Sequence, residues 1–553
     1  MKMLKVNMTR DEVIVETFPR DKILGGRALT SYLMTEYGSP TDHALSEKNC
    51  FIVAPGLLAG TSAPQSGRIS VGVKSPLTGG IKESNAGGTV AHLLGRLGIQ
   101  GIVVEGKAKE WQVLKITADS AELEPAGDIV GMGNYAACDQ LRKRYGEKIG
   151  IMVTGRAGEM KMPNSTVAVT DTEGRPSRQC ARGGPGAVMG AKGLKAIVVD
   201  SKGGSLRKPA DDSFKAAIKE ATEAIKNGDA TEMIHTLGSA AFIQLEHDRG
   251  SLPSYNHSQG SFDKVENLTA EKMVKLIEAR GGAMGHGCMP GCVVRCSPIY
   301  HDADGHFLTA AFEYETLGML GANLGIDDMD AIARMDRRCD ELGFDTIETG
   351  SAIGVLHEVG LFEFGDAARA EALIEEMGKG TPLGRILGSG VTGTAKAFGI
   401  ARVPAVKGQG IPAHSARSSK GWAVTYATTA MGADHTAGIV MDEPLSTEGQ
   451  VERSEGAQIY SAAQDATGLC LYTFLSPELT VPMINSFYGI NWSVEDYLEM
   501  GKEILRQERT FNINAGIGKE ADRLPDWLTR EPLPPTNAVF DVAQKEIDGI
   551  FNF

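Results

Sequence analysis

The sequence predicts an α+β fold in which a β-rich N-terminal part precedes two mainly helical domains. Short segments that are β-branched or alternate in polarity, bounded by Gly or Pro, fill the chain up to about residue 203. From about residue 213 most segments instead carry apolar residues at the i, i+3, i+4 spacing of helices. Strands gathered in one part and helices in the rest indicate segregated layers rather than alternating βαβ units.

The N-terminal part carries strand patterns separated by turns. They include residues 3–8, 13–18, 68–74, 101–106, 112–117 and 195–200. Helices are expected to interrupt them near residues 89–97 and 135–145, and the turn-like stretch that begins at residue 201 ends this part of the chain.

Helical spacing then recurs to the end of the chain. It is clearest at residues 214–226, 270–279, 329–343, 370–378 and 494–507. Pro and Gly interrupt it near residues 402–409. At roughly 150 residues per domain, a chain of 553 residues is long enough for three or four domains. We expect three, at residues 1–203, 204–402 and 403–553.

The charge balance limits the partners of this chain. Lys and Arg total 56 against 70 Asp and Glu, for a formal charge of −14. Non-specific binding to nucleic acid or to an anionic membrane is therefore not expected, and a bound anion needs a local basic site.

Charges at Arg10, Asp11 and Glu12 interrupt any apolar signal segment, and no stretch approaches 18 apolar residues. We expect a cytoplasmic protein without a membrane segment.

Glycine is in excess and is concentrated in two segments. The chain has 68 glycines, about 12% against an average near 7%. The segments span residues 54–95 and 181–197, and each holds an arginine, Arg68 or Arg182, among small residues. In the first, Asn85, Ala86, Gly87 and Gly88 lead into a predicted helix.

Two interpretations of these segments are open. Glycine lets the backbone approach a ligand, and a helix N-terminus favours an anion, so a phosphate-bearing ligand fits. The alternative is tight turns in a β-rich domain, with Lys192 and Lys195 as surface charges. Neither segment has the pattern of a P-loop or of a dinucleotide fingerprint.

Three of the eight cysteines crowd into a short loop. Cys288, Cys292 and Cys296 follow a C-x3-C-x3-C pattern, and the glycines and proline between residues 287 and 291 disfavour a continuous helix there. Such a loop needs a distant fourth ligand, and Cys470, after a predicted helix, is the candidate. The pattern favours a 4Fe-4S cluster. Zinc and unligated thiols stay open as alternatives. The remaining cysteines are expected in the core: Cys50, Cys138, Cys180 and Cys339.

Taken together, these features resemble the aldehyde ferredoxin oxidoreductase family. The resemblance runs almost end to end, through GGRALTSYL, SAPQSGR, ESNAGG, ARGGPGAVMGAKGLKAI, the cysteine loop, FEYETLGMLGANLGI, GFDTIETG, MGADHTAG and DATGLC. It implies tungsten or molybdenum held by two pyranopterins, with a 4Fe-4S cluster beside it. The cysteine spacing departs from the C-x2-C-x3-C common in this family, which leaves the substrate class open.

The resemblance also implies which residues bind the cofactors. Arg68 and Arg182 would contact pterin phosphates or the cluster region, and the backbone at Asn85 and Gly183 would line a Mg2+ that bridges the phosphates. Asp345 and Asp465 would hydrogen-bond the two pterin rings; without the resemblance they are helix caps or surface charges. The further cofactor-binding candidates are Ala86, Gly87, Gly88, Gly184, Gly468 and Leu469.

For the chemistry, the resemblance points to Glu313 or Glu315 as a base and to His435 as a proton donor or acceptor. The glutamates are two residues apart, so on a helix only one of them is expected to face the metal. The plain alternative makes both glutamates solvated and His435 a helix-terminal residue. Weaker candidates for substrate or interface roles are His357, Glu358 and His414.

The implied function is a tungsten or molybdenum bis-pyranopterin oxidoreductase that interconverts an aldehyde and a carboxylic acid. Electrons would pass through the cluster to ferredoxin or to a partner iron–sulfur subunit, and the family implies a dimer or larger assembly. One alternative keeps the cofactors and changes the substrate to a 2-hydroxycarboxylate or an aryl-CoA. Another is a non-catalytic iron–sulfur electron-transfer subunit.

Overall fold

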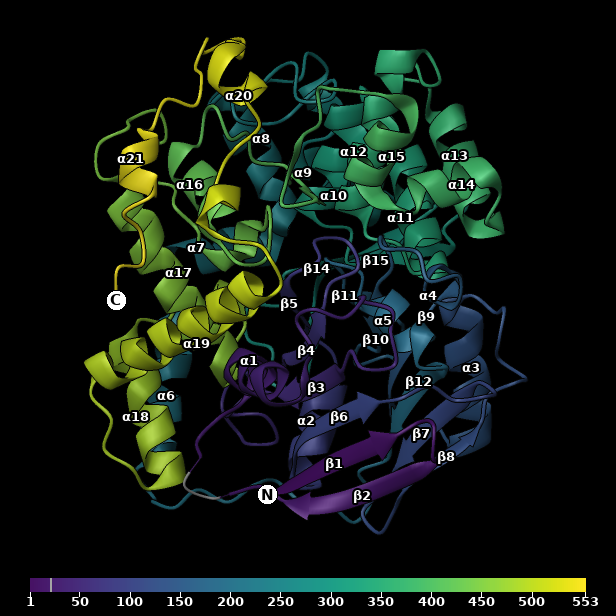
Figure 1. Ribbon diagram of the computed structural model, residues 1–553, viewed down its shortest axis with the longest axis vertical. Coiled ribbons are helices and arrows are strands. Elements are labelled where there is room, and N and C mark those ends of the chain that lie inside the picture. Colours follow the sequence, from purple (N-terminus) through teal and green to yellow (C-terminus); the bar gives the residue numbers. More distant parts are fainter. Residues whose placement is uncertain (20–21) are drawn as a thin grey trace.

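The computed structural model describes residues 1–19 and 22–553 and confirms the α+β class. Its N-terminal part holds two six-stranded sheets, at the lower right of Figure 1, and helical domains adjoin them above and to the left. The first sheet has the order β2–β1–β6–β3–β4–β5, and its only parallel pair among the described residues is β1–β6. Its strands are β1 (Lys2–Asn7), β2 (Glu12–Thr17), β3 (Phe51–Pro55), β4 (Ile69–Lys74), β5 (Ile81–Ala86) and β6 (Ile99–Glu105).

The second sheet repeats this plan with the order β11–β10–β9–β12–β7–β8 and one parallel pair, β7–β12. Its strands are β7 (Gln112–Ile116), β8 (Ala121–Pro125), β9 (Gly150–Thr154), β10 (Val167–Val169), β11 (Arg178–Cys180) and β12 (Leu194–Val199). The helices of this part are α1 (Gly26–Tyr37), α2 (Val90–Arg96), α3 (Asn134–Tyr145), α4 (Arg156–Glu159) and α5 (Pro185–Ala191).

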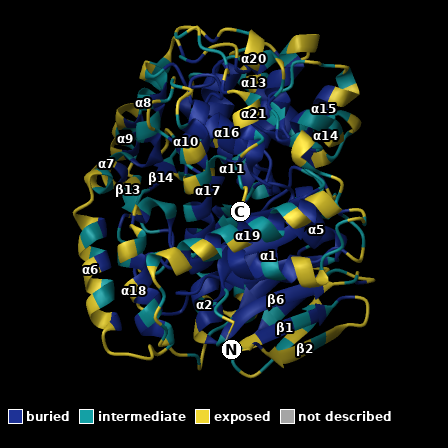
Figure 2. Ribbon diagram, turned by 60° about the vertical axis from the view of Figure 1, so that its left-hand side comes forward, coloured by how far each residue is buried: buried dark blue, intermediate teal, exposed yellow. Residues whose placement is uncertain are grey.

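The inner strands bury both of their faces, which is why they are apolar almost throughout. Val53 and Val71 point into a core shared by the two sheets, α2 and α5, whereas the neighbouring Ile52 packs under α1 on the opposite face. Successive strand residues point to opposite faces, so a strand covered on both sides has few polar positions. In Figure 2 these strands are buried and the edge strand β2 is largely exposed.

The central part of the chain is helical apart from one small sheet. The helices are α6 (Phe214–Lys226), α7 (Asp229–Leu237), α8 (Phe242–Asp248), α9 (Ala270–Ala279), α10 (Tyr314–Thr316), α11 (Met329–Leu342), α12 (Thr346–Gly354), α13 (Ala367–Lys379), α14 (Pro382–Leu387) and α15 (Gly390–Phe398). The sheet consists of β13 (Ala283–His286), β14 (Ser297–His301) and β15 (Phe307–Ala310), and the cysteine loop joins its first two strands.

The C-terminal part packs against both other parts. After the short pair β16 (Ala405–Val406) and β17 (Gln409–Gly410) come α16 (Lys420–Thr428), α17 (Gln450–Thr467), α18 (Pro477–Tyr488), α19 (Val494–Asn514), α20 (Trp527–Arg530) and α21 (Gln544–Ile547). Helix α6 lies against α18 rather than with the other central helices, and Phe214 contacts Phe487 with ring centroids 5.3 Å apart. The division at residues 203 and 402 stays a prediction.

The glycines and lysines of the second glycine-rich segment serve packing. A Cβ atom on Gly190 of α5 would lie 2.0 Å from the carbonyl oxygen of Gly158 in α4, so the two helices touch backbone to backbone. The structure contradicts the interpretation of the two lysines as surface charges, because both are buried. Lys192 Nζ donates to the carbonyl oxygens of Ser46 and Glu47, and Lys195 Nζ pairs with Glu159.

Candidate functional site

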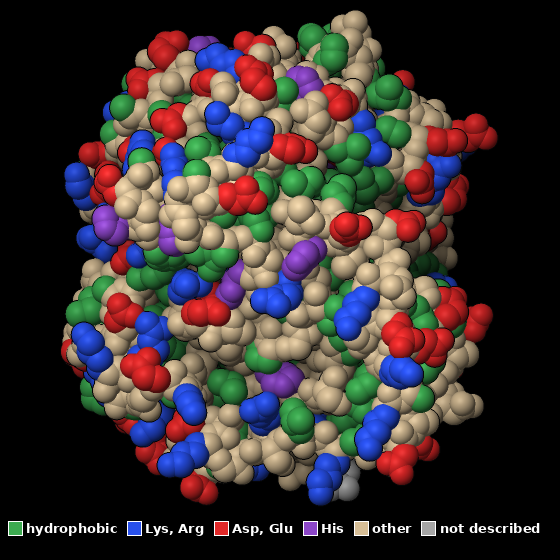
Figure 3. Space-filling view, turned by 180° about the vertical axis from the view of Figure 1, so that it is seen from behind, with side chains coloured by type: hydrophobic (Ala, Val, Ile, Leu, Met, Phe, Trp, Pro, Cys, Tyr) green, Lys and Arg blue, Asp and Glu red, His purple; other side chains and the backbone are tan. Residues whose placement is uncertain are grey.

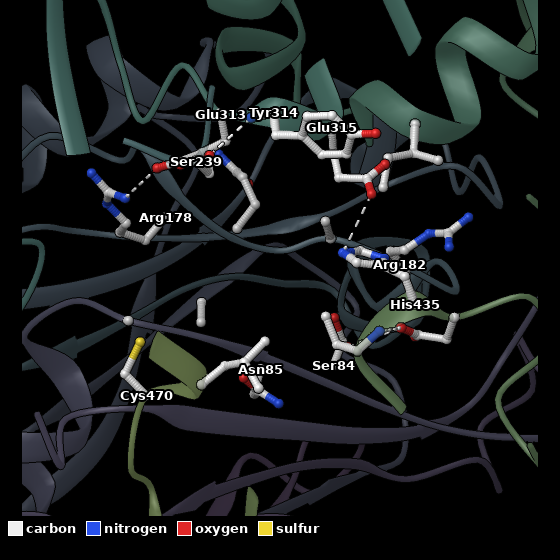
Figure 4. Close-up of a pocket in the computed structure, with 18 of the residues that line it drawn as sticks. Ser84, Asn85, Arg178, Arg182, Ser239, Glu313, Tyr314, Glu315, His435 and Cys470 are labelled. Carbon is white, nitrogen blue, oxygen red and sulfur yellow. Dashed lines mark hydrogen bonds and ion pairs between the residues drawn. The ribbon is translucent and has the colours of Figure 1, made fainter. Parts of the chain in front are cut away.

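A cavity of about 430 Å³ lies where the three parts of the chain meet. Figure 4 shows Ser84 and Asn85 from the N-terminal part on one side of it and Glu313, Tyr314 and Glu315 from the central part on the other. The predicted site residues that line it are Arg68, Asn85, Ala86, Gly87, Arg182, Cys288, Cys296, Glu313, Glu315, Asp345, His435, Asp465 and Cys470.

Some predicted site residues lie beside the cavity but not in its lining. Leu469 packs in an apolar core, and Gly468 fits against Gly56, where a Cβ atom on Gly56 would lie 2.2 Å from the Gly468 Cα. The others are Gly88, Gly183, Gly184 and Cys292. His357 is stacked on Phe364 with ring centroids 4.0 Å apart, and neither it nor Glu358 lines the cavity.

One buried glutamine holds the cysteine loop against the segment that carries Cys470. The side-chain oxygen of Gln65 accepts the backbone N–H groups of Val293 and Val294 at 3.1 and 2.7 Å. Its backbone N–H donates to Gly291, and its carbonyl oxygen accepts the N–H of Cys470 at 2.9 Å. Sequence reasoning did not single out Gln65, although it stands inside the SAPQSGR segment.

The four predicted ligand cysteines gather at this junction, and the other four cysteines are buried in the core, as expected. Cys288 and Cys470 are buried side by side, with Cys292 packed against them. The Cys288 thiol donates a hydrogen bond to Cys292, and this bond together with burial raises the pKa of Cys288 well above its usual value; burial also raises the pKa of Cys470. Positive charges oppose the rise without cancelling it: Arg178 and Arg68 do so at Cys288, and Arg68 does so at Cys470.

A network of charges joins the first glycine-rich segment to Asp465. Arg68 Nε donates to Asn85 Oδ1 at 2.5 Å, and Asn85 Nδ2 donates to Asp465 Oδ1 at 3.2 Å. The other carboxylate oxygen of Asp465 lies 3.3 Å from Arg27 Nη1. Burial raises the pKa of the Asp465 carboxyl, although Arg27 and Arg68 both work against the rise.

A second arginine–aspartate pair lies at Arg182 and Asp345. Arg182 donates to the carbonyl oxygens of Gly410 and Ala433, each at 2.5 Å, and its Nε lies 3.5 Å from Asp345 Oδ2. Asp345 also caps α12, because its carboxylate accepts the N–H groups of Ile347 and Glu348. It therefore serves as a helix cap and lines the cavity as well.

The two glutamates of the EYE segment point to different parts of the cavity (Figure 4). Glu313 precedes α10 and lies with Ser239 and Arg178, and its Oε1 is 3.7 Å from Arg178 Nη1. Glu315, in α10, has its Oε1 3.6 Å from His435 Nε2. Burial lowers the pKa of His435, so its imidazole is neutral near pH 7.

Several buried polar atoms around the cavity make no hydrogen bond within the part of the chain that the structure describes. Among the described residues, the buried atoms without a hydrogen bond include Nε and Nη2 of Arg178, Nε of Arg182, Oε1 of Glu315 and Nδ1 of His435. Because buried polar atoms are almost always paired, such a group suggests a site built for a polar ligand. Arg178 was not predicted, since nothing in the pattern of β11 marks it as turned into a cavity.

Comparison with known proteins agrees with this arrangement. The sequence profile described as the N-terminal domain of aldehyde ferredoxin oxidoreductase matches residues 3–201, and the profile for its domains 2 and 3 matches residues 216–549. The chain belongs to the aldehyde ferredoxin oxidoreductase family. It is therefore an oxidoreductase, as the resemblance implied.

Individual relatives span nearly the whole chain. Tungsten-containing aldehyde ferredoxin oxidoreductases from Pyrococcus furiosus and Thermococcus kodakarensis are each 32% identical over 96% of this chain and 92% of their own length. An aliphatic sulfonate oxidoreductase subunit, described as WOR-like, from Pyrococcus furiosus is 26% identical over 96% of this chain and 90% of its own.

A solved structure shares the fold at low identity. The active-site complex BamBC of benzoyl coenzyme A reductase, in complex with 1,5-dienoyl-CoA, superposes with a TM-score of 0.82 and 19% identity over 99% of this chain and 92% of its own. None of the helices in the described residues combines the length and the apolar character needed to cross a membrane.

Proposed function

We propose that this chain is a tungsten or molybdenum bis-pyranopterin oxidoreductase that interconverts an aldehyde and a carboxylic acid. Electrons pass through a 4Fe-4S cluster to ferredoxin or to a partner iron–sulfur subunit. The observation that carries the proposal is one cavity lined by three of the four predicted ligand cysteines, two arginine–aspartate pairs and a glutamate–histidine pair, with Cys292 packed beside it. The names of the relatives that are 32% identical support tungsten, aldehydes and ferredoxin.

The residues present fit the pterins. Two sets of side chains each combine a cation with a carboxylate: Arg68 with Asp465, and Arg182 with Asp345. A pterin carries both a phosphate and ring N–H groups, so two pterins require two such sets. Nε of Arg182 and Nε and Nη2 of Arg178 make no hydrogen bond within the described residues and are therefore donors for such a ligand. We also propose a Mg2+ ion at the backbone of Asn85 and Gly183. The carbonyl oxygen of Asn85 already accepts a hydrogen bond from Arg68, and that of Gly183 accepts one from Ser75.

The cysteine geometry favours a cluster over a single zinc ion. Tetrahedral Zn–S bonds of about 2.3 Å place the sulfur atoms within about 4 Å of one another. Among the described residues, no three of the cysteine sulfur atoms lie within 4.8 Å of one another. Groups of ligand atoms that close together occur elsewhere, at Asp171, Glu173 and His286 and at Asp302, Asp304 and His306. Cys288 and Cys292 are hydrogen-bonded to each other, but the set as a whole is spaced more widely than one zinc ion needs, which suits a 4Fe-4S cluster, whose four iron atoms separate the thiolates.

When bound, the metal centre accepts two electrons from the substrate. The chain's own groups handle the protons: an aldehyde and water give a carboxylic acid, two electrons and two protons. Glu315 takes a proton at its unpaired Oε1, and the neutral imidazole of His435, 3.6 Å away, accepts or returns a proton at Nε2. The surrounding apolar walls, such as Phe344 and Ile347, limit the access of water to these groups.

We propose that the electron acceptor docks on the cysteine loop. Gly291 and Arg295 are exposed in this loop, and Cys292 is half-buried between them. An iron–sulfur partner that docks on the loop therefore comes near the cluster ligands. Figure 3 shows one face of the molecule, on which acidic and basic side chains are interspersed. A dimer or larger assembly stays a prediction.

The test is a substrate panel with the anaerobically purified enzyme and a viologen dye as electron acceptor. Aliphatic and aromatic aldehydes are expected to reduce the dye, and 2-hydroxy acids and aryl-CoA thioesters are not. Dye reduction by hydroxy acids alone would replace the proposed substrate class with the 2-hydroxycarboxylates. Failure of the whole panel in enzyme that holds iron and tungsten or molybdenum would contradict the proposal.

A further inference from the structure

The glutamate and histidine at the cavity continue into a second pair: His414, which also lines the cavity, and Glu246, which does not. His414 Nε2 is 3.5 Å from Glu315 Oε1, the same oxygen that faces His435. His414 Nδ1 is 3.4 Å from Glu246 Oε2. Four ionisable side chains therefore alternate between imidazole and carboxylate in one line: His435, Glu315, His414 and Glu246.

The line ends near the surface. Glu246, in α8, is fully buried, and its Oε1 lies 3.6 Å from Nη1 of Arg249, whose side chain is 33% exposed. The guanidinium does not lose its proton, so it cannot be a carrier. Arg249 is the partly exposed group in contact with Glu246, and its positive charge favours the ionised carboxylate.

Atoms along this line lack partners. Both oxygens of Glu246, Nδ1 of His414 and Oε1 of Glu315 are buried and have no hydrogen bond within the described chain. A carboxylate kept for packing or stability is normally satisfied by donors, because an unsatisfied buried group costs about 1–3 kcal/mol. Contacts of 3.4 to 3.6 Å lie a few tenths of an ångström beyond a hydrogen bond. Small rotations or a bridging water close that gap.

The ring of His414 is held so that each nitrogen faces a different carboxylate. Trp422 stacks on it with ring centroids 3.9 Å apart, and Tyr314 lies at 4.9 Å. The hydroxyl of Tyr426 donates to the His414 carbonyl oxygen. An aromatic face stabilises a protonated imidazole. His435 lies 6.0 Å from His414 between ring centroids.

We propose that Glu315, His414 and Glu246 form a relay that carries protons from the cavity to the surface beside Arg249. The relay rests on the proposed function, because oxidation of an aldehyde with water releases two protons in the cavity while the two electrons leave through the cluster to the iron–sulfur acceptor.

Each transfer has a defined donor and acceptor. Glu315 passes a proton from Oε1 to Nε2 of His414, which becomes an imidazolium and gives its Nδ1 proton to Glu246 Oε2. Glu246 releases the proton to water beside Arg249. Exchange with water restores the starting tautomer of His414 before the next proton arrives.

The test compares two rates in holoenzyme carrying Glu246→Gln or His414→Gln. In the first turnover Glu315 still accepts a proton, so the rate of cluster reduction, followed by its visible absorbance after rapid mixing with substrate, stays within about twofold of wild type. In steady state the protons no longer leave by this route, so kcat falls by about 10- to 100-fold, with little change in KM and a larger solvent deuterium isotope effect.

The matched controls are Glu363→Gln and His357→Gln, a carboxylate–imidazole pair 3.8 Å apart that does not line the cavity. Both control variants are expected to match wild type in both rates. A His414→Gly variant with imidazole added to the buffer is a second arm, in which kcat is expected to rise with imidazole concentration.

Three results would overturn the relay: unchanged kcat in both Gln variants, equal losses in the first turnover and in steady state, or no response of the glycine variant to imidazole. The proposed function fails separately. If neither aldehydes nor hydroxy acids reduce a viologen with the wild-type enzyme, that function is wrong and the relay falls with it. Normal wild-type turnover with unaffected variants overturns the relay alone.

Discussion

Glu313 and Glu315 are separated by one residue but differ in what surrounds their carboxylates. Glu313 accepts hydrogen bonds from Ser239 at 2.5 Å and from Ser297 at 3.3 Å and pairs with Arg178, so its oxygens are already engaged. Glu315 accepts one backbone N–H, from Ala413, and its other oxygen faces His435 and His414 without a hydrogen bond. The unengaged oxygen makes Glu315 the candidate base.

The two glutamates are therefore expected to respond unequally to the same substitution. Glu315→Gln removes the proton acceptor and should lower kcat by about 100- to 10,000-fold with little change in KM, whereas Glu313→Gln should lower it by less than about tenfold. Steady-state viologen assays of the two variants measure this difference. A larger loss for Glu313→Gln would move the base to Glu313, and small, equal losses would show that neither residue is the base.

At the scale of elements, the decisive contact is between the turn after β5 and the cysteine loop. A Cβ atom on Gly87 would lie 3.0 Å from the sulfur of Cys288, tighter than most real Cβ contacts, so the sulfur would have to shift by a few tenths of an ångström. The first glycine-rich segment therefore brings backbone against the predicted cluster ligands. The sequence left two interpretations of this segment open, a phosphate site and tight turns. Close packing against the cysteine loop is a third role for its glycines.

Gly87→Ala is expected to displace Cys288 and to lower the iron content of the purified protein well below that of wild type. Gly127→Ala is the matched control, because a Cβ atom there meets nothing within 4 Å. Iron determination per chain and the electron paramagnetic resonance signal of the reduced cluster measure the effect. Wild-type iron content and signal in Gly87→Ala would remove this contact from the account.

The elements that sequence patterns did not predict share one physical cause. Every residue of α5 is buried, and most of α1 is buried between the first sheet and the C-terminal helices. A helix covered on nearly all sides has no polar stripe, so the 3.6-residue period that identifies a surface helix is lost. Helices with one buried face were predicted: α11 to within one residue at its end, and α19 from its first residue, although it continues to Asn514, beyond the predicted end at residue 507.

At the scale of the whole molecule, a buried ion pair links the N-terminal and C-terminal parts. Arg27 in α1 donates from Nε and Nη2 to the two oxygens of Glu508 in α19, each at 2.9 Å, and both side chains are buried. Ser31 adds a third hydrogen bond to the same carboxylate. Because Arg27 also contacts Asp465, this pair ties the packing between domains to the lining of the cavity.

Arg27→Met leaves Glu508 buried without its partner and is expected to cost about 3–5 kcal/mol of stability, seen as a lower Tm. Arg506→Met is the matched control on the same helix, because its pairs with Glu499 and Glu503 are exposed and are worth about 0–1 kcal/mol. Thermal unfolding of both variants at equal protein concentration tests this. Equal Tm values for the two would show that the buried pair does not hold the domains together.

The site was predictable where its residues stand in contiguous segments and not where distant segments meet. The cysteines, Asp345, Asp465 and the EYE glutamates stand in motifs that can be read along the chain. The contact of Glu246 with His414, and the turn of Arg178 into the cavity, depend on how separate elements pack. No local pattern records such contacts, so the structure was needed to find them.

The central claim is that four cysteines and two arginine–aspartate pairs hold a 4Fe-4S cluster beside a tungsten or molybdenum pterin centre. Elemental analysis of anaerobically purified protein tests it most directly. The account predicts about four irons and one tungsten or molybdenum per chain. Iron without either heavy metal, or zinc in place of iron, would contradict it.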